Sequence, residues 1–147
     1  MIDWMHLEDK YCEGRFRSSY FRDDENNDEL LVYMISPDLT ECAEKCVAAF
    51  NDLTHSVIDE ICKKLISCAK EDNTDKEFEL PALNRPTDIL NYCWFVALTV
   101  DMTNNEDEVA YAVEGEGDWG REVGFVIRNN QVVYVGADYD DYLKKIK

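Results

Sequence analysis

The strongest constraint on the fold is the pair Asn129-Asn130, which lies between two runs of β-favouring residues, 123–128 and 131–135. Asparagine tolerates positive φ, and a two-residue type I′ turn requires positive φ at both of its central positions. A tight antiparallel hairpin is therefore predicted at the C-terminal end of the chain. Its predicted register pairs Ile127 with Val132 and Phe125 with Tyr134.

Other β-favouring runs precede this hairpin in the sequence. Residues 94–100 and 109–116 are predicted as two further strands, separated by an acidic loop and followed by a turn at 117–120. Near the N-terminus, residues 15–21 and 30–35 are predicted as a second hairpin around a polar loop. The C-terminal half of the chain is thus expected to form an antiparallel sheet.

Residues 36–71 carry the clearest helical pattern. Apolar residues recur there at steps of three and four, which places them on one helix face. Ser36 suits the position before the first helical turn, and Pro37 suits the first helical position. Because one helix of this length would be long for a globular domain, a break is expected near Asn51-Asp52 or Thr54-His55.

Composition places these elements in one globular unit. Apolar residues make up 46% of the 147 residues, a normal share for a chain with a hydrophobic core. We expect residues 1–147 to form a single α+β domain. In the expected architecture, a long helix packs on an antiparallel sheet of four to six strands.

The net charge of −17 limits the partners of the chain. Residues 101–122 are the most acidic segment, with eight carboxylates and one arginine. A surface this negative repels nucleic acid and anionic membranes, and it accelerates association with a basic protein. The charge also serves solubility, and the sequence does not decide between these two roles.

Six cysteines occur without a Cys-x-x-Cys pair. Four of them lie in the helical segment 36–71, where an unpaired cysteine acts as a small hydrophobic residue. We expect free, buried thiols, and we favour core packing over metal binding for Cys42 and Cys46. The N-terminus lacks the basic and apolar stretches of a signal peptide, so the expected location is cytoplasmic.

Known catalytic motifs are absent from the sequence. His6 and His55 are the only histidines, and no serine-hydrolase, zinc-peptidase or nucleotide-binding pattern occurs. We therefore expect no enzymatic activity, no cofactor and no bound metal. The alternative is a small carboxylate- or metal-dependent hydrolase, because Glu114 and Glu116 share one strand face with Asp118 just beyond.

Trp119 lies in a glycine-rich acidic turn. A tryptophan in such a turn can contact a partner, or it can fold back and close the open end of the sheet. We favour packing. The neighbouring glycines are compatible with both roles, because they permit tight turns near the ring.

The stretch 113–124, with 126–128 and 133–136, resembles a group of small acidic bacterial proteins described only as a domain of unknown function. The shared pattern is an acidic residue followed by Asp-Trp, then an acid, a glycine and a hairpin ending in Val-Gly. The chain departs from this pattern at Gly117, Gly120 and Val123. Such proteins are similar in kind to immunity proteins, which bind a bacterial toxin.

Together, the charge and the resemblance imply a binding protein, in its narrowest form an immunity-type inhibitor that covers a basic partner. A structural subunit of a homo-oligomer, with Trp4, Tyr20 and Phe21 at the contact, is a further alternative. The candidate partner-binding residues are Asp101, Glu106, Asp107, Glu108, Glu114, Glu116, Asp118, Trp119 and Glu122.

Overall fold

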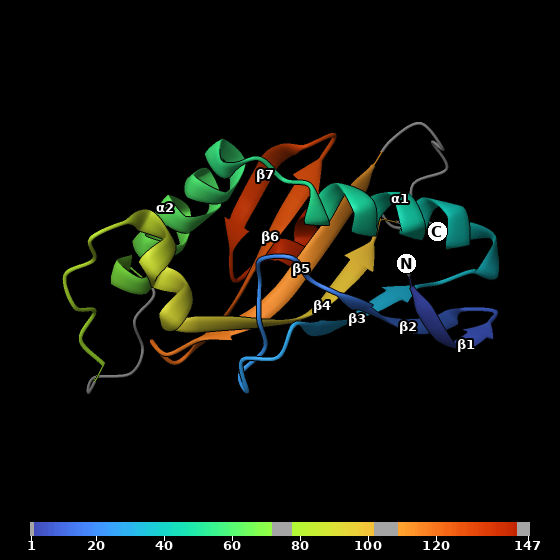
Figure 1. Ribbon diagram of the computed structural model, residues 1–147, viewed down its shortest axis with the longest axis horizontal. Coiled ribbons are helices and arrows are strands. Elements are labelled where there is room, and N and C mark those ends of the chain that lie inside the picture. The colour runs from blue at the N-terminus through green and yellow to red at the C-terminus, as the bar shows by residue number, and fades with distance from the viewer. Residues whose placement is uncertain (1, 72–77, 102–108, 144–147) are drawn as a thin grey trace.

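The computed structural model describes residues 2–71, 78–101 and 109–143, which form one mixed sheet with two α-helices (Figure 1). The seven strands follow one another across the sheet in chain order. The strands are β1 (Asp3–Glu8), β2 (Tyr11–Arg17), β3 (Glu29–Met34), β4 (Cys93–Val100), β5 (Ala110–Gly117), β6 (Arg121–Arg128) and β7 (Gln131–Gly136). The helices are α1 (Thr40–Asn51) and α2 (His55–Glu71), with short 3-10 helices η1 (Pro37–Leu39), η2 (Pro86–Asn91) and η3 (Tyr139–Tyr142).

The expected architecture, a long helix on an antiparallel sheet of four to six strands, is wrong. The sheet has seven strands within the described residues, and β3 runs parallel to β4. A parallel pair requires a long crossover connection, and here α1, α2 and η2 form it. The predicted helical segment is also divided, because α1 ends at Asn51 and α2 begins at His55.

Local signals placed the helix boundaries well. The Ser36 side chain accepts a hydrogen bond from the Asp38 N–H at 3.2 Å, and Pro37 follows at the first helical position. Ser36 caps η1, which leads directly into α1. The Thr54 hydroxyl accepts a hydrogen bond from the Val57 N–H at 3.3 Å at the start of α2, so the break falls in the predicted region.

Both predicted strand pairs are present, but two details differ. The first strand of the N-terminal pair, predicted at 15–21, is β2 at Tyr11–Arg17, and the C-terminal hairpin has one error of register. Asn129 and Asn130 both have positive φ, 49° and 65°, and Ile127 pairs with Val132 as expected. Phe125 pairs with Val135 instead of Tyr134, because an irregularity between Val126 and Ile127 shifts the ladder by one residue. Strand β1 was not predicted.

The helices and the sheet enclose one main core. Both helices lie on the same side of the sheet, and their apolar faces join the inward side chains of the strands (Figure 1). Four phenylalanines form its centre. The ring centroid of Phe21 lies 5.2 to 5.4 Å from those of Phe50, Phe95 and Phe125, and the Phe95 and Phe125 centroids are 5.3 Å apart. Phe21 is 1% exposed and therefore unavailable as an oligomer contact, whereas Tyr20 is exposed.

Trp119 is fully buried at the turn between β5 and β6. Its ring lies against Gly117 and contacts the Phe78 ring at a centroid distance of 6.4 Å. Gly120 completes the turn with φ +83°, a value that favours glycine. The packing role expected for Trp119 is confirmed, and the tryptophan contributes no exposed surface to a partner.

The opposite side of the sheet carries the C-terminal segment. Tyr139 of η3 packs on Ala112 of β5 and Val126 of β6, with Tyr134 and Leu143 alongside. These residues form a second, smaller apolar cluster on the side of the sheet that the helices do not cover. Glu114 of β5 and Glu122 of β6 lie at the edge of this cluster, where they contact Tyr139.

Candidate functional site

The candidate site forms where η3 crosses the outer face of β5 and β6. Three contacts hold η3 in place. The Tyr134 hydroxyl accepts a hydrogen bond from the Asp138 N–H at 3.1 Å, and the Tyr134 ring stacks on Tyr142 at 4.1 Å. Arg128 also donates a hydrogen bond to the Tyr142 carbonyl at 3.1 Å. The short C-terminal helix is thereby fixed to strands β6 and β7.

Gly124 allows the Tyr139 ring to lie close to the sheet. A Cβ atom at position 124 would lie 2.5 Å from the Tyr139 ring, so a larger residue would displace the ring. The ring therefore packs closely on β6, and its hydroxyl contacts Glu114 of β5 and Glu122 of β6. Gly124, the glycine of the family-like pattern in the sequence, thus allows Tyr139 to pack closely on the sheet.

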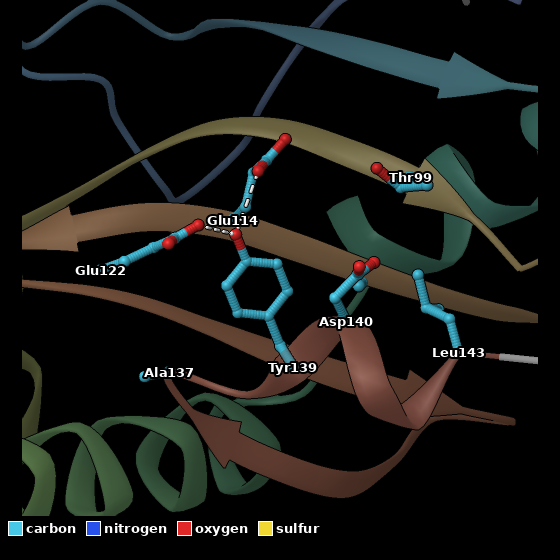
Figure 2. A pocket seen from close by; sticks show the side chains of 8 residues that line it. Thr99, Glu114, Glu122, Ala137, Tyr139, Asp140 and Leu143 are labelled. Carbon is cyan, nitrogen blue, oxygen red and sulfur yellow. Dashed lines mark hydrogen bonds between the residues drawn. The ribbon is translucent and has the colours of Figure 1, made fainter.

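The Tyr139 hydroxyl contacts two carboxylates (Figure 2). It lies 3.0 Å from Glu114 Oε2 and forms a short contact with Glu122 Oε1. A phenol has one hydrogen and donates it to one acceptor at a time. The two carboxylates consequently share a single donor, although together they have several acceptor sites.

A cavity of about 400 Å³ opens beside this cluster. Its lining consists of Thr99, Ala112, Glu114, Glu122, Ala137, Tyr139, Asp140 and Leu143. Three of these side chains are carboxylates, and no lysine or arginine is among the described residues that line it. The cavity is thus a small acidic recess with a partly apolar floor.

Burial and the neighbouring carboxylates keep the tyrosines of this face protonated. Burial, followed by the hydrogen bond to Glu122, raises the pKa of Tyr139 well above its ordinary value. Burial and a hydrogen bond to Glu13 raise the pKa of Tyr33 on β3 to about 12, with a smaller contribution from the charge of Glu114. At neutral pH, Tyr139 is therefore a hydrogen-bond donor and not a general base.

The structure brings together part of the predicted acidic set. Glu114 and Glu122 converge at Tyr139, and Glu116 lies directly opposite Glu122 in the β5–β6 ladder. Like charges in opposed positions repel each other, so this arrangement lowers stability unless a cation lies nearby. Asp118 is exposed in the turn beyond them.

Asp101 does not belong to this exposed surface. It is 1% exposed at the end of β4, where it forms an ion pair with Arg128. Its backbone N–H also bonds to the Ala110 carbonyl at 2.9 Å. Glu106, Asp107 and Glu108 lie outside the described residues.

Tyr139, Asp140 and Thr99 line the cavity but were not predicted from the sequence as site residues. No local sequence pattern indicated which face of the sheet the residues after β7 would cover. Tyr139 is 25 residues from Glu114 and 17 from Glu122. One signal was available, because the apolar residues Tyr139, Tyr142 and Leu143 lie in an otherwise polar tail, where such residues often mark a packing contact.

The described part of the chain contains no group of three or more histidine, cysteine, aspartate or glutamate side chains arranged to hold a metal ion. Within the same residues, no helix is both long enough and apolar enough to cross a membrane.

Comparison with known proteins gives a family but no activity. No curated protein and no solved structure matches the chain. One family model, described as a domain of unknown function (DUF6985), matches residues 5–143. The resemblance to a domain-of-unknown-function family is thus confirmed, without support for a bacterial origin or for likeness to immunity proteins. Because the match covers nearly the whole chain, the protein belongs to the DUF6985 family of domains of unknown function.

Proposed function

We propose that this protein is a binding protein whose acidic pocket receives a cationic side chain of a basic protein partner. The observation that carries the proposal is the convergence of Glu114 and Glu122 on one hydroxyl in an open cavity. One phenolic hydrogen leaves most acceptor sites of the two carboxylates available. A guanidinium or ammonium group would supply the missing donors and neutralise the charge.

The size and surroundings of the pocket support this class of ligand. A volume of about 400 Å³ accommodates the end of an arginine or lysine side chain. The Tyr139 ring and Ala112 line the cavity beside the carboxylates, so the aliphatic stem of the incoming side chain has apolar contacts. Glu116, which pairs with Glu122 in the β5–β6 ladder, and Asp118 are exposed and add to the negative surface.

The net charge of −17 favours the same kind of partner. Long-range attraction increases the association rate for a basic protein, and its effect decreases as salt screens the charges. The narrower proposal is an immunity-type inhibitor that covers the functional surface of a basic toxin. It rests on the resemblance of the sequence and requires an identified partner.

A labelled oligoarginine peptide tests the binding proposal directly. Glu114→Gln/Glu122→Gln removes the two pocket carboxylates, and Glu60→Gln/Glu79→Gln removes two exposed carboxylates elsewhere. Both double variants change the net charge equally. We expect the pocket variant to weaken peptide binding by about tenfold, which corresponds to about 1.4 kcal/mol, and the control to cause a smaller change.

The comparison also separates a specific pocket from general charge attraction. Equal weakening by the two double variants would contradict the proposal, because it would show that the peptide responds only to net charge. Capture from a host lysate at low salt, eluted with a salt gradient, then tests the immunity-type form. That form predicts one basic protein that elutes late, whereas many weakly retained basic proteins would contradict it.

The hydrolase remains the second candidate, because two carboxylates do converge in a concave site. Against it, Tyr139 engages both carboxylates, and its raised pKa keeps the hydroxyl protonated at neutral pH, so that it cannot accept a proton. Hydrolysis of model ester or glycoside substrates that is lost in Glu114→Gln/Glu122→Gln would favour this candidate over binding alone.

A further inference from the structure

The further inference concerns the outer face of β1, β2 and β3, on the same side of the sheet as the acidic pocket. The inward side chains of these strands, such as Cys12 and Val32, are buried in the main core. Because side chains alternate between the two faces of a sheet, Tyr11, Glu13 and Tyr33 point outward. Tyr11 is 47% exposed, and Glu13 and Tyr33 are partly exposed. This part of the sheet is therefore accessible to a partner.

A carboxylate lies among three aromatic rings on this face. In the strand ladders, Glu13 lies directly opposite His6 of β1 and Tyr33 of β3. Tyr11 precedes Glu13 by two residues on β2, so its ring lies on the same face. The Tyr11 ring centroid is 5.9 Å from that of His6 and 6.3 Å from that of Tyr33. These four residues, His6, Tyr11, Glu13 and Tyr33, are called the aromatic subsite below.

The aromatic subsite has the chemistry that recognises a guanidinium group. A guanidinium stacks on aromatic rings and donates paired hydrogen bonds to a carboxylate. Glu13 accepts hydrogen bonds from the Tyr11 and Tyr33 hydroxyls, and about two of its four acceptor sites remain for another donor. Arg15, on the same face of β2, already pairs with Glu29 at 3.5 Å. An arginine from a partner would therefore pair with Glu13 and stack on a tyrosine ring.

The aromatic subsite continues into the acidic pocket. Tyr33 lies opposite Thr99 in the parallel β3–β4 ladder, and Thr99 lines the cavity together with Glu114. Thr99 in turn pairs with Ala112, two residues before Glu114 on β5. Glu13 and Glu114 are thus three strands and two residues apart, which corresponds to about 16 Å at the usual strand spacing and rise. One short peptide segment can span this distance.

We propose that the aromatic subsite and the acidic pocket together bind one extended basic segment of the partner, with an arginine in each and three residues between the two arginines. This inference rests on the proposed function and adds the arginine spacing of the partner. Residues i and i+4 of an extended chain are about 13 Å apart and point to the same side, and arginine side chains cover the remaining distance. Adjacent arginines are only about 3.3 Å apart and point to opposite sides, so they fill one subsite at a time.

The test uses the folded, full-length protein and two labelled peptides of identical glycine, serine and arginine composition. One peptide has three residues between its two arginines, and in the other the arginines are adjacent. We expect fluorescence anisotropy to show about tenfold tighter binding of the spaced peptide, because its second contact is intramolecular. Equal affinities would overturn this inference, although the proposed function stands if Glu114→Gln/Glu122→Gln weakens both peptides. If that double variant weakens neither peptide, the proposed function and this inference both fail.

Substitutions in the aromatic subsite locate the second contact. Glu13→Gln and Tyr11→Ala should each reduce the difference between the two peptides to less than about twofold, because the spaced peptide loses its second contact. Glu60→Gln, which removes an exposed carboxylate of α2, is the control of equal charge and should preserve the tenfold difference. Circular dichroism checks the fold of each variant. A difference that persists in both Glu13→Gln and Tyr11→Ala would overturn the proposal.

Sedimentation of the free protein tests whether a second copy of the chain occupies this face instead. We expect a monomer whose sedimentation is unchanged in Tyr11→Ala. A dimer that Tyr11→Ala dissociates would overturn the proposal, because the partner molecule would then cover the aromatic subsite.

Discussion

The indole ring of Trp119 packs against the backbone of Gly117, at a point where any Cβ atom would overlap the ring. Gly117 is the last residue of β5, and Trp119 lies in the turn that follows. The Gly-Asp-Trp-Gly segment therefore closes the end of the core, with Gly117 needed for packing and Gly120 for the positive φ of the turn. The Asp-Trp turn in the sequence therefore has a structural role.

Gly117→Ala should destabilise the protein through overpacking. The added methyl group displaces the Trp119 ring from a fully buried position, and such changes typically cost about 1–3 kcal/mol. Urea unfolding followed by tryptophan fluorescence measures the cost. Gly120→Asn is a useful comparison, because asparagine tolerates the positive φ at that exposed position. A loss smaller than that of Gly120→Asn would contradict the packing role.

Arg128→Gln should be strongly destabilising. Asp101 is fully buried, and loss of its arginine partner leaves a carboxylate in a poorly solvated position, at a cost of about 3–5 kcal/mol. Arg85→Gln is the matched control, because Arg85 pairs with Asp88 at 3.7 Å in an exposed position. Chemical denaturation compares the two, and similar small losses would show that the Asp101–Arg128 pair is effectively solvated.

Alkaline pH should weaken the fold before the buried tyrosines ionise. The pKa of Tyr33 is raised to about 12, and that of Tyr139 is also raised, from an ordinary value of 10.0. A raised pKa contributes stability that is fully present below pH 10 and is lost as the pH rises through the folded-state value. Phenolate absorbance should therefore titrate later in the folded protein than in urea. Coincident titration curves would contradict the burial of these hydroxyls.

Tyr139→Phe separates the contribution of the hydroxyl to stability from its effect on peptide binding. Loss of its hydrogen bond should cost about 0.5–1.5 kcal/mol of stability. The same change leaves both carboxylates without their internal donor, so affinity for an oligoarginine peptide should increase. Isothermal titration calorimetry with the peptide measures this effect. A decreased affinity would mean that the hydroxyl itself contacts the ligand.

Particular elements show how far the sequence could predict this fold. Asn129-Asn130, Ser36-Pro37 and the helix break each depend on neighbouring residues, and the structure confirms all three. Strand β1 was missed because its side chains are mostly exposed at the sheet edge and show no alternation. The parallel β3–β4 pair was missed because it joins segments separated by the whole helical region.

The candidate site illustrates the same limit. Glu114 and Glu122 were both named as members of the acidic segment 101–122, but their charge alone could not indicate that they meet. Their convergence depends on Tyr139, whose position is set by packing on Ala112, Val126 and Gly124. Asp101 was grouped with these residues because of its charge. It is instead buried in an ion pair with Arg128, which lies 27 positions later in the sequence.

The most direct test of the central claim is NMR of the side-chain carboxyl carbons during titration with an oligoarginine peptide. The account predicts that the signals of Glu114 and Glu122 shift together and saturate, while those of Glu60 and Glu79 change little. Such a result would place the cationic group beside the two carboxylates that meet at Tyr139. Uniform small shifts across all exposed carboxylates, with none larger at Glu114 or Glu122, would contradict the proposed pocket.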